Sequence, residues 1–446
     1  MKRFVLRLLP TSQIMRRLAL LAGGAALGQG FVVLATPLLT RIYSPGDFGV
    51  FTVVINLLAI VGAAACLRYE QAIPLCRDDD DAAHALALAL LTSVVLAALV
   101  ALTIGLLGAP VAALVGMTEH RALLWWLPLG VLGWGLFFAL DAWALRRGVL
   151  SDIVYGRLAS ALTLVGLQLG LGLAGGGPAG LIVGFILASL PNVAPVLLRL
   201  GRERPDLPRR IRVAGIVAAA GRHRRFPQFS AGAMMLGNAS IMLPAFLLAA
   251  LYGLEVAGWY GLAQRVVGLP VRFIATSASQ VYISETAKLS GGQGAVVEAL
   301  FTQLARRLFL IGLVCLGALA ALAPWLFGLV FGAQWTPSGV LTALLAPMYL
   351  GMFVATSIAY TLNLLERQDL VLKLDLLRAA ILGASFAAAY GLELGYAAAV
   401  AVYSLGTAAY YLLYFVVVRR LLRKHTARGG RPLPGIRGQE NQTTAE

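Results

Sequence analysis

The sequence is short of charged residues, and of acids above all. Of its 446 residues, 13% are charged and 59% apolar, whereas a soluble domain averages about 25% charged and about 45–50% apolar. So few charges cannot cover a water-facing surface of this size, which excludes a soluble globular protein. Lys and Arg number 36 against 20 Asp and Glu, for a net charge of +16. The basic residues gather in a minority of segments, which excludes a disordered or nucleic-acid-binding chain.

Cysteine is also scarce. Cys66, Cys76 and Cys315 are too few and too scattered for a disulfide framework or a metal site. The four histidines have no Cys or Ser partner near them in the sequence. We therefore predict no catalytic site, no metal site and no cofactor.

Long apolar runs, in contrast, are abundant. A hydrocarbon core about 30 Å thick needs about 20 apolar residues per helical crossing, and continuous runs of that length indicate helices rather than the alternating strands of a barrel. The sequence predicts an all-α, multi-pass membrane protein with about twelve spanning helices. The expected spans are 14–39, 48–73, 84–107, 122–145, 154–174, 179–198, 229–251, 256–283, 308–330, 339–362, 372–392 and 396–418.

Two polar stretches divide the chain. We expect a six-helix lobe over 1–198, a basic cytoplasmic linker over 199–228, a second six-helix lobe over 229–418, and a basic, disordered cytoplasmic tail over 419–446. Within the linker, the apolar patch 211–220 is bracketed by arginines. This pattern predicts a helix that lies at the interface with anionic lipid.

The basic residues also predict the orientation. If the N-terminus is cytoplasmic and twelve helices cross, only Arg41 and Arg121 of the 36 Lys and Arg fall on the outer side. Basic residues favour the cytoplasmic side, so both termini are predicted to be cytoplasmic.

Two stretches about two hundred residues apart share a pattern. Each of 36–51 and 243–260 has a Pro in a helix, a Tyr at its outer end, an acid in the loop, and a Gly shortly before an aromatic residue. Both stand on the first helix of a six-helix half, which predicts a parallel repeat and two pseudo-symmetric halves around a central cavity. A chance match is the alternative, because Gly and Pro are common in membrane helices.

The same stretches carry a family resemblance. Residues 40–49 (TRIYSPGDFG), 68–73 (RYEQAI), 225–227 (RFP) and 257–265 (AGWYGLAQR) resemble bacterial O-antigen and capsular polysaccharide flippases, the Wzx-type members of the multidrug/oligosaccharidyl-lipid/polysaccharide exporter (MOP) superfamily. The resemblance implies a transporter, not an enzyme, in the bacterial inner membrane. It would move an undecaprenyl-pyrophosphate-linked oligosaccharide to the outer leaflet by alternating access. Expected partners are this substrate, membrane lipids, and a polysaccharide polymerase with its chain-length regulator, but no nucleic acid.

Charges inside apolar segments are the candidate site residues. An intramembrane charge costs at least about 2.5–3.5 kcal/mol, so it marks function by default. We predict that Arg68, Arg265 and Arg272 line the cavity and bind the pyrophosphate, because Arg grips phosphate oxygens bidentately. The last two stand seven residues apart, hence on one helix face. The alternative is that all three extend to the inner interface and only set topology.

Two acids are candidates for coupling transport to H⁺ or Na⁺. Glu70 and Asp141 lie in predicted spans, where a carboxylate near arginines can change its charge with conformation. A static ion pair with an arginine is the alternative for either residue.

Other charge and glycine patterns favour structural roles. The acids Asp78 to Asp81 just precede a helix, whose N-terminus they would cap. Asp375 and Arg378 are three apart and should pair with each other. Three Gly-xxx-Gly pairs, at 24 and 28, 166 and 170, and 180 and 184, predict close helix packing.

Two other functions stay open. A drug or small-cation exporter of the same superfamily should line its cavity with acids and aromatics. A membrane polysaccharide polymerase or ligase should carry a long outer loop with catalytic residues, and the outer loops expected here are short.

Overall fold

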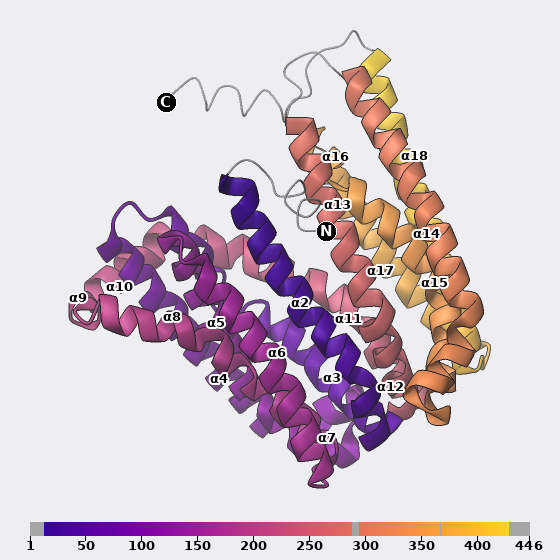
Figure 1. Ribbon diagram of the computed structural model, residues 1–446, viewed down its shortest axis with the longest axis horizontal. Helices are drawn as coiled ribbons and strands as arrows, with labels where there is room; N and C mark the ends of the chain where they lie inside the picture. The colour runs from indigo at the N-terminus through magenta and orange to yellow at the C-terminus, as the bar shows by residue number, and fades with distance from the viewer. Residues whose placement is uncertain (1–12, 288–293, 366, 428–446) are drawn as a thin grey trace, which may run out of the picture. The chain divides into compact units, whose positions relative to one another are not determined.

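The structure is a computed structural model that describes residues 13–287, 294–365 and 367–427. Over these ranges the chain consists of helices joined by turns, without a β-strand (Figure 1). The predicted all-α fold is confirmed. Contacts group the chain into two compact units, Met1–Gly258 and Trp259–Glu446. Each unit is described by itself.

The first unit consists of long helices with shorter ones between them. The long helices are α2 (Gln13–Ile42), α3 (Pro45–Gly62), α4 (Asp79–Leu114), α5 (Leu127–Arg147), α6 (Leu150–Leu173), α7 (Gly177–Leu187), α8 (Ser189–Glu203) and α11 (Gly232–Tyr252). The shorter ones are η1 (Tyr69–Leu75), η2 (Thr118–Trp126), α9 (Leu207–Arg210), α10 (Val213–Arg222) and η3 (Phe226–Ala231). Helix α12 (Leu254–Ala263) begins in this unit and ends in the next.

The second unit continues α12 through a π-turn into a further helix. Its elements are η4 (Gln264–Gly268), α13 (Leu269–Ala287), α14 (Gly294–Phe331), η5 (Ala333–Trp335), α15 (Thr336–Ile358), α16 (Tyr360–Leu364), α17 (Gln368–Gly391) and α18 (Tyr396–Ala427). Helix α15 is central, because α13, α14 and α18 all pack against it, while α17 packs on α18.

Among the described residues, nine helical segments are long and apolar enough to cross a membrane. The protein is therefore a multi-pass membrane protein. Each expected span except 48–73 coincides with one helix or with a run of consecutive helical segments. The three expected spans outside those nine fall on α2, α11 and α17, so the count of twelve stays a prediction.

The second expected span, 48–73, is too long. Helix α3 ends at Gly62, and turns lead from there to η1. Leu67 and Arg68 have φ angles of 48° and 66°, in the left-handed region that an α-helix cannot accommodate. Apolar composition predicted the continuous run but could not show this break in the backbone.

The two copies of the repeat place their matching glycines at one crossing. Pro37 and Pro244 both lie inside helices, α2 and α11. A Cβ on Gly49 in α3 would overlap the carbonyl oxygen of Leu254, and a Cβ on Gly258 in α12 would overlap that of Pro45. The contact is reciprocal, so each copy needs its glycine for the other's backbone to approach.

The predicted close packing of glycine pairs holds for two of the three. A Cβ on Gly24 in α2 would lie 2.7 Å from Val154 Cγ1 of α6, and one on Gly184 in α7 would lie 2.8 Å from Gln168 Cγ. Gly166 and Gly170 have nothing within 4 Å of an added Cβ, so that part of the prediction is wrong.

The linker region is mostly helical. Helix α8 carries the chain to Glu203, and α10 covers most of the expected apolar patch 211–220. At the other end, α18 continues to Ala427, while 428–446, the bulk of the expected tail, lie outside the described residues. The predicted lobe boundaries stay predictions.

Candidate functional site

Arg68 and Glu70 form an ion pair between two spans of the first unit. Arg68 Nη1 lies 3.3 Å from Glu70 Oε1, and both side chains are largely buried. Arg68 Nε and Glu70 Oε2 are buried without a hydrogen-bond partner among the described residues. Burial raises the pKa of the Glu70 carboxyl. The backbone hydrogen bond of Glu70 and the charge of Arg68 lower the pKa, but they offset this increase only in part. The pair lies in and just before η1 and not, as the sequence predicted, inside a spanning helix.

Asp141 of α5 also has a basic partner. Arg157 of α6 places Nη2 3.7 Å from Asp141 Oδ1, with both side chains half-buried. The pair joins neighbouring helices of the first unit. This arrangement suits the static pair that the sequence left open as an alternative to ion coupling.

Arg265 of the second unit stands in a π-turn. The Leu269 N–H donates to the Gln264 carbonyl, five residues back, and Pro270 has no N–H to donate to the preceding turn. Arg265 Nη1 is buried with no hydrogen-bond partner among the described residues. π-turns within helices are frequent at functional sites. The wider turn also shifts the helical register, so a seven-residue spacing no longer places Arg265 and Arg272 on one face.

Arg272 lies among buried tyrosines. It is close enough to the hydroxyls of Tyr260, Tyr349 and Tyr411 to interact with them electrostatically. Gln264 Nε2 donates to the Tyr260 hydroxyl at 2.7 Å. The Tyr349 hydroxyl is buried with no partner among the described residues. Hydroxyls of α12, α15 and α18 thus converge near one guanidinium.

Arg378 of α17 joins the same group. It pairs with Asp375 at 3.3 Å, as the three-residue spacing predicted, and it also hydrogen-bonds Tyr411. Tyr403 interacts electrostatically with Arg378, Tyr260 and Tyr411. We name this group the arginine–tyrosine cluster; its members are Tyr260, Arg272, Tyr349, Arg378, Tyr403 and Tyr411.

The sequence reasoning missed the tyrosines of this cluster. Tyr403, Tyr410, Tyr411 and Tyr414 follow one another at spacings that return to one side of a helix. That spacing was the available signal. It did not point to a polar site, because tyrosines are also enriched at membrane interfaces. Chemically, two guanidiniums with phenolic hydroxyls and one paired acid suit an anion rich in oxygens.

The first unit carries a different group of arginines. Asp78 caps α4 by accepting from Asp81 N–H at 2.7 Å, which confirms the predicted cap. The three aspartates that follow it bind arginines of α5, the linker and α10. We name this group the ion-pair belt; its pairs are Asp79 with Arg146, Arg147 and Arg204, Asp80 with Arg210, and Asp81 with Arg222.

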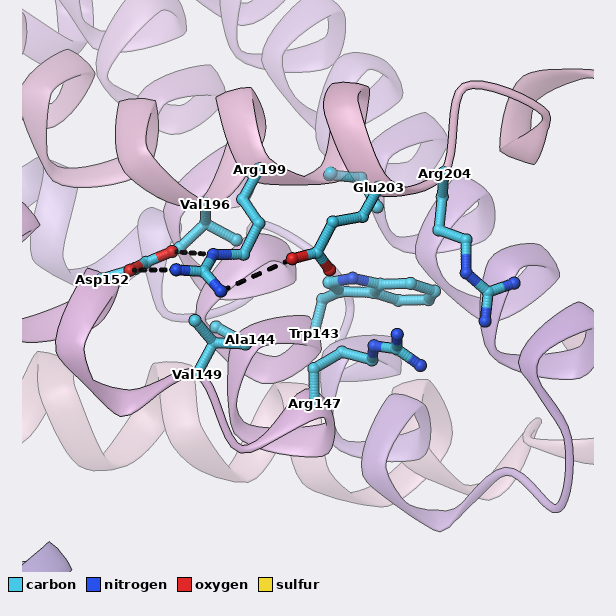
Figure 2. A pocket seen from close by; sticks show the side chains of 10 residues that line it. Trp143, Ala144, Arg147, Val149, Asp152, Val196, Arg199, Glu203 and Arg204 are labelled. Atoms are coloured by element: carbon cyan, nitrogen blue, oxygen red, sulfur yellow. Dashed lines mark hydrogen bonds and ion pairs between the residues drawn. The ribbon is translucent and has the colours of Figure 1, made fainter.

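A small polar pocket adjoins the belt. Figure 2 shows Arg199 between the carboxylates of Asp152 and Glu203, with Arg147 and Arg204 on the side of Trp143. Arg199 Nε lies 2.6 Å from Asp152 Oδ2, and its Nη1 lies 3.5 Å from Glu203 Oε1. The charges here are paired, and within the described residues no group of acids, His and Cys suited to a metal occurs.

Comparison with models of known protein families shows which family this chain belongs to. The model of a family described as "Polysaccharide biosynthesis protein" matches residues 38–340, more than half of the chain. The chain belongs to this family. The match includes the second copy of the repeat, all of the first from residue 38 onward, and the four stretches that carry the resemblance. No curated protein matches the sequence.

Solved structures show which fold this family member has. An inward-facing multidrug-resistance MATE transporter of the MOP superfamily matches with a TM-score of 0.57 at 13% identity, over 92% of this chain and 98% of that one. An outward-facing form matches with a TM-score of 0.55 at 14% identity, over 93% and 96%. A Vibrio cholerae MATE transporter variant matches with a TM-score of 0.52 at 14% identity, over 92% and 97%. The chain therefore has the MATE-like fold of two halves.

Proposed function

We propose that the protein is a flippase that moves an undecaprenyl-pyrophosphate-linked oligosaccharide from the cytoplasmic to the outer leaflet. The proposal is carried by the arginine–tyrosine cluster, in which the Tyr349 hydroxyl is buried without a hydrogen-bond partner among the described residues. Arg265 of η4 supports it, since its Nη1 is likewise buried without a partner there. Leaving a buried polar group unpaired costs about 1–3 kcal/mol, and more when it is charged. A ligand with anionic oxygens would supply the missing partners.

The substrate's chemistry explains why such a cluster is needed. A pyrophosphate and its sugars cannot cross hydrocarbon unaided, because removing their water is prohibitive. Arg265 and Arg272, with Arg68 of the first unit, would bind the phosphate oxygens while the lipid tail stays in the bilayer. The cluster's hydroxyls would complete the hydrogen bonds that water gave up.

The mechanism we infer is alternating access. The MATE fold is known in inward-facing and outward-facing forms, which supports rocking of two halves around a central site. Glu70 and Asp141 are the residues proposed to couple the motion to H⁺ or Na⁺. Transport that continues unchanged after collapse of both ion gradients would remove that role from them.

The cellular setting follows from the same proposal. The flippase would act in the bacterial inner membrane with both termini cytoplasmic, in O-antigen, capsule or exopolysaccharide synthesis. A polysaccharide polymerase and its chain-length regulator would use the product on the outer face.

A drug or small-cation exporter is the second candidate. The likeness to multidrug-resistance transporters favours it, but an exporter of cations would not be expected to place two arginines beside an acid that is already paired. A polymerase or ligase has less support, since the solved structures that share the fold are transporters.

The deciding experiment asks where lipid-linked oligosaccharide accumulates when the protein is depleted. We expect accumulation on the cytoplasmic face, measured by labelling of intact and everted membrane vesicles with a sugar-specific lectin. Depletion of the polymerase is the matched control and should give accumulation on the outer face. Outer-face accumulation after depletion of this protein contradicts the flippase proposal, and unchanged oligosaccharide with lost drug resistance supports the exporter.

A further inference from the structure

Helix α10 of the linker is fixed to the first unit by one side only. Ala219 on that side is buried, and Gly215 packs so closely on His84 of α4 that a Cβ would overlap the imidazole. Arg222 forms an ion pair with Asp81, and His84 Nε2 accepts from the Arg212 N–H at 3.2 Å. These contacts set which side of α10 points away from the protein.

That outward side is apolar. Val213 is 78% exposed and Val217 is 65% exposed, and Ala214 and Ala218 beside them are exposed too. Spacings of one, four and five residues place all four on the same side of an α-helix. A stripe of four uncharged side chains on a ten-residue helix is unusual for a surface that faces water.

Basic residues without acidic partners stand at both ends of this stripe. Arg212 precedes it, and Arg224 and Arg225 follow it; all three are exposed, and none pairs with an acid of the described chain. The belt arginines nearby, such as Arg210, are neutralised by aspartates. The stripe is therefore framed by a positive charge that the protein does not balance.

Helix α10 contacts the part of α4 that is expected to lie at the membrane surface. Its partners Asp81 and His84 lie in the first two turns of α4, which is a candidate span of 36 residues. At about 1.5 Å per residue such a helix exceeds a hydrocarbon core about 30 Å thick. Its first turns thus reach the headgroup layer, and α10 lies level with them.

We propose that α10 docks on the headgroup layer of an anionic phospholipid leaflet. Val213 and Val217 would enter the boundary of the acyl chains, and Arg212, Arg224 and Arg225 would contact lipid phosphates. Through the ion-pair belt, this docking would hold the first unit at a fixed depth. The proposal is independent of what the protein transports.

A spin label on the stripe tests the proposal. The full chain carries Ala218→Cys, with Cys76 and Cys315 replaced by Ala and the buried Cys66 retained. It is reconstituted in nanodiscs of phosphatidylcholine alone or with phosphatidylglycerol. Accessibility of the label to oxygen and to a water-soluble nickel chelate gives its depth. A label at Gly201→Cys, exposed at the end of α8, serves as the control position.

We expect the label at 218 to be accessible to oxygen and shielded from nickel in anionic discs, while the label at 201 stays accessible to nickel. Replacing Arg212, Arg224 and Arg225 with Gln should weaken docking, by about fivefold per arginine. Val217→Glu should expose the label without removing any arginine.

Three results would overturn the proposal. A label at 218 that is accessible to nickel in both discs shows no docking. A label buried in lipid equally in both discs, with or without the arginines, shows that anionic lipid is not recognised. A label shielded from both probes shows that a protein surface covers the stripe instead.

Discussion

The arginines of the two units have opposite surroundings. In the ion-pair belt of the first unit, five arginines meet three aspartates at the ends of α4, α5 and the linker. In the arginine–tyrosine cluster of the second unit, two arginines, Arg272 and Arg378, meet hydroxyls, and one acid, Asp375, pairs with Arg378. The same residue type thus serves two purposes, which its partners distinguish.

This difference indicates which arginines are available to bind a ligand. A guanidinium held by a carboxylate has its charge balanced and its donors used, so it contributes to the fold. A guanidinium among hydroxyls keeps its charge, and a buried one with a free donor is costly until an anion arrives. Four predictions test this distinction, from the largest expected effect to the smallest.

Removing Arg265 of η4 or Arg272 of the cluster should have the largest effect. We expect Arg265→Ala and Arg272→Ala each to lower transport about tenfold to a hundredfold, since a hydrogen bond to a charged group is worth about 1.5–3 kcal/mol. The readout is surface polysaccharide at equal membrane protein level. Arg→Lys variants should retain part of the activity because they keep the charge. Normal polysaccharide in every variant would place these arginines in a topological role only.

Breaking the belt should lower stability instead of transport. Asp79→Asn leaves Arg146, Arg147 and Arg204 facing a neutral amide in a partly exposed site, so we expect a loss of about 1–2 kcal/mol. Thermal aggregation of the purified protein in detergent measures it. Transport per folded molecule should stay near normal, and a large drop there would give the belt a direct part in transport.

Two tyrosine variants sharpen the view of the cluster. Tyr349→Phe removes a hydroxyl that has no hydrogen-bond partner among the described residues, so stability should hold while transport falls about threefold to tenfold. Tyr260→Phe is the matched control, because it breaks the bond from Gln264 and should lower the melting temperature. If Tyr349→Phe lowers stability and leaves transport intact, the hydroxyl is structural.

The smallest effect is expected at an exposed pair outside both groups. Arg367 bonds Asp369 at 2.8 Å and lowers the pKa of that carboxyl to about 2. A lowered carboxyl pKa gives stability that is present above the unfolded value of 3.8 and lost as pH falls through about 2. Asp369→Asn should therefore change the melting temperature little, and by the same amount at pH 5 and pH 8. A difference between these two pH values would contradict the assignment.

Much of the fold could be predicted because the hydrophobicity of a segment is the sum of its residues' contributions and can be read from the sequence. Apolar runs of membrane length predicted the helices, and the Pro, Tyr and Gly pattern predicted the repeat that Gly49 and Gly258 bring into contact. The end of α3 could not be predicted, because Leu67 and Arg68 adopt left-handed angles that composition does not encode.

The site was predicted in part for a related reason. Charges in apolar runs pointed to Arg265 and Arg272, but tyrosines give no such signal, since they suit both a membrane interface and a polar interior. Arg378 was predicted to pair with Asp375 alone, and its bond to Tyr411 depends on how α17 packs on α18.

The sequence by itself determined that this chain is a membrane protein, that it crosses the membrane many times as helices, and that it carries arginines within apolar runs, because the cost of exposing apolar surface or burying charge is a property of each residue. Tertiary structure alone decided which arginines are neutralised and which are not. Asp79 reaches Arg204 and Arg272 reaches Tyr411 across segments far apart in the chain. Electrostatic energy depends on distance in space, and only packing sets that distance.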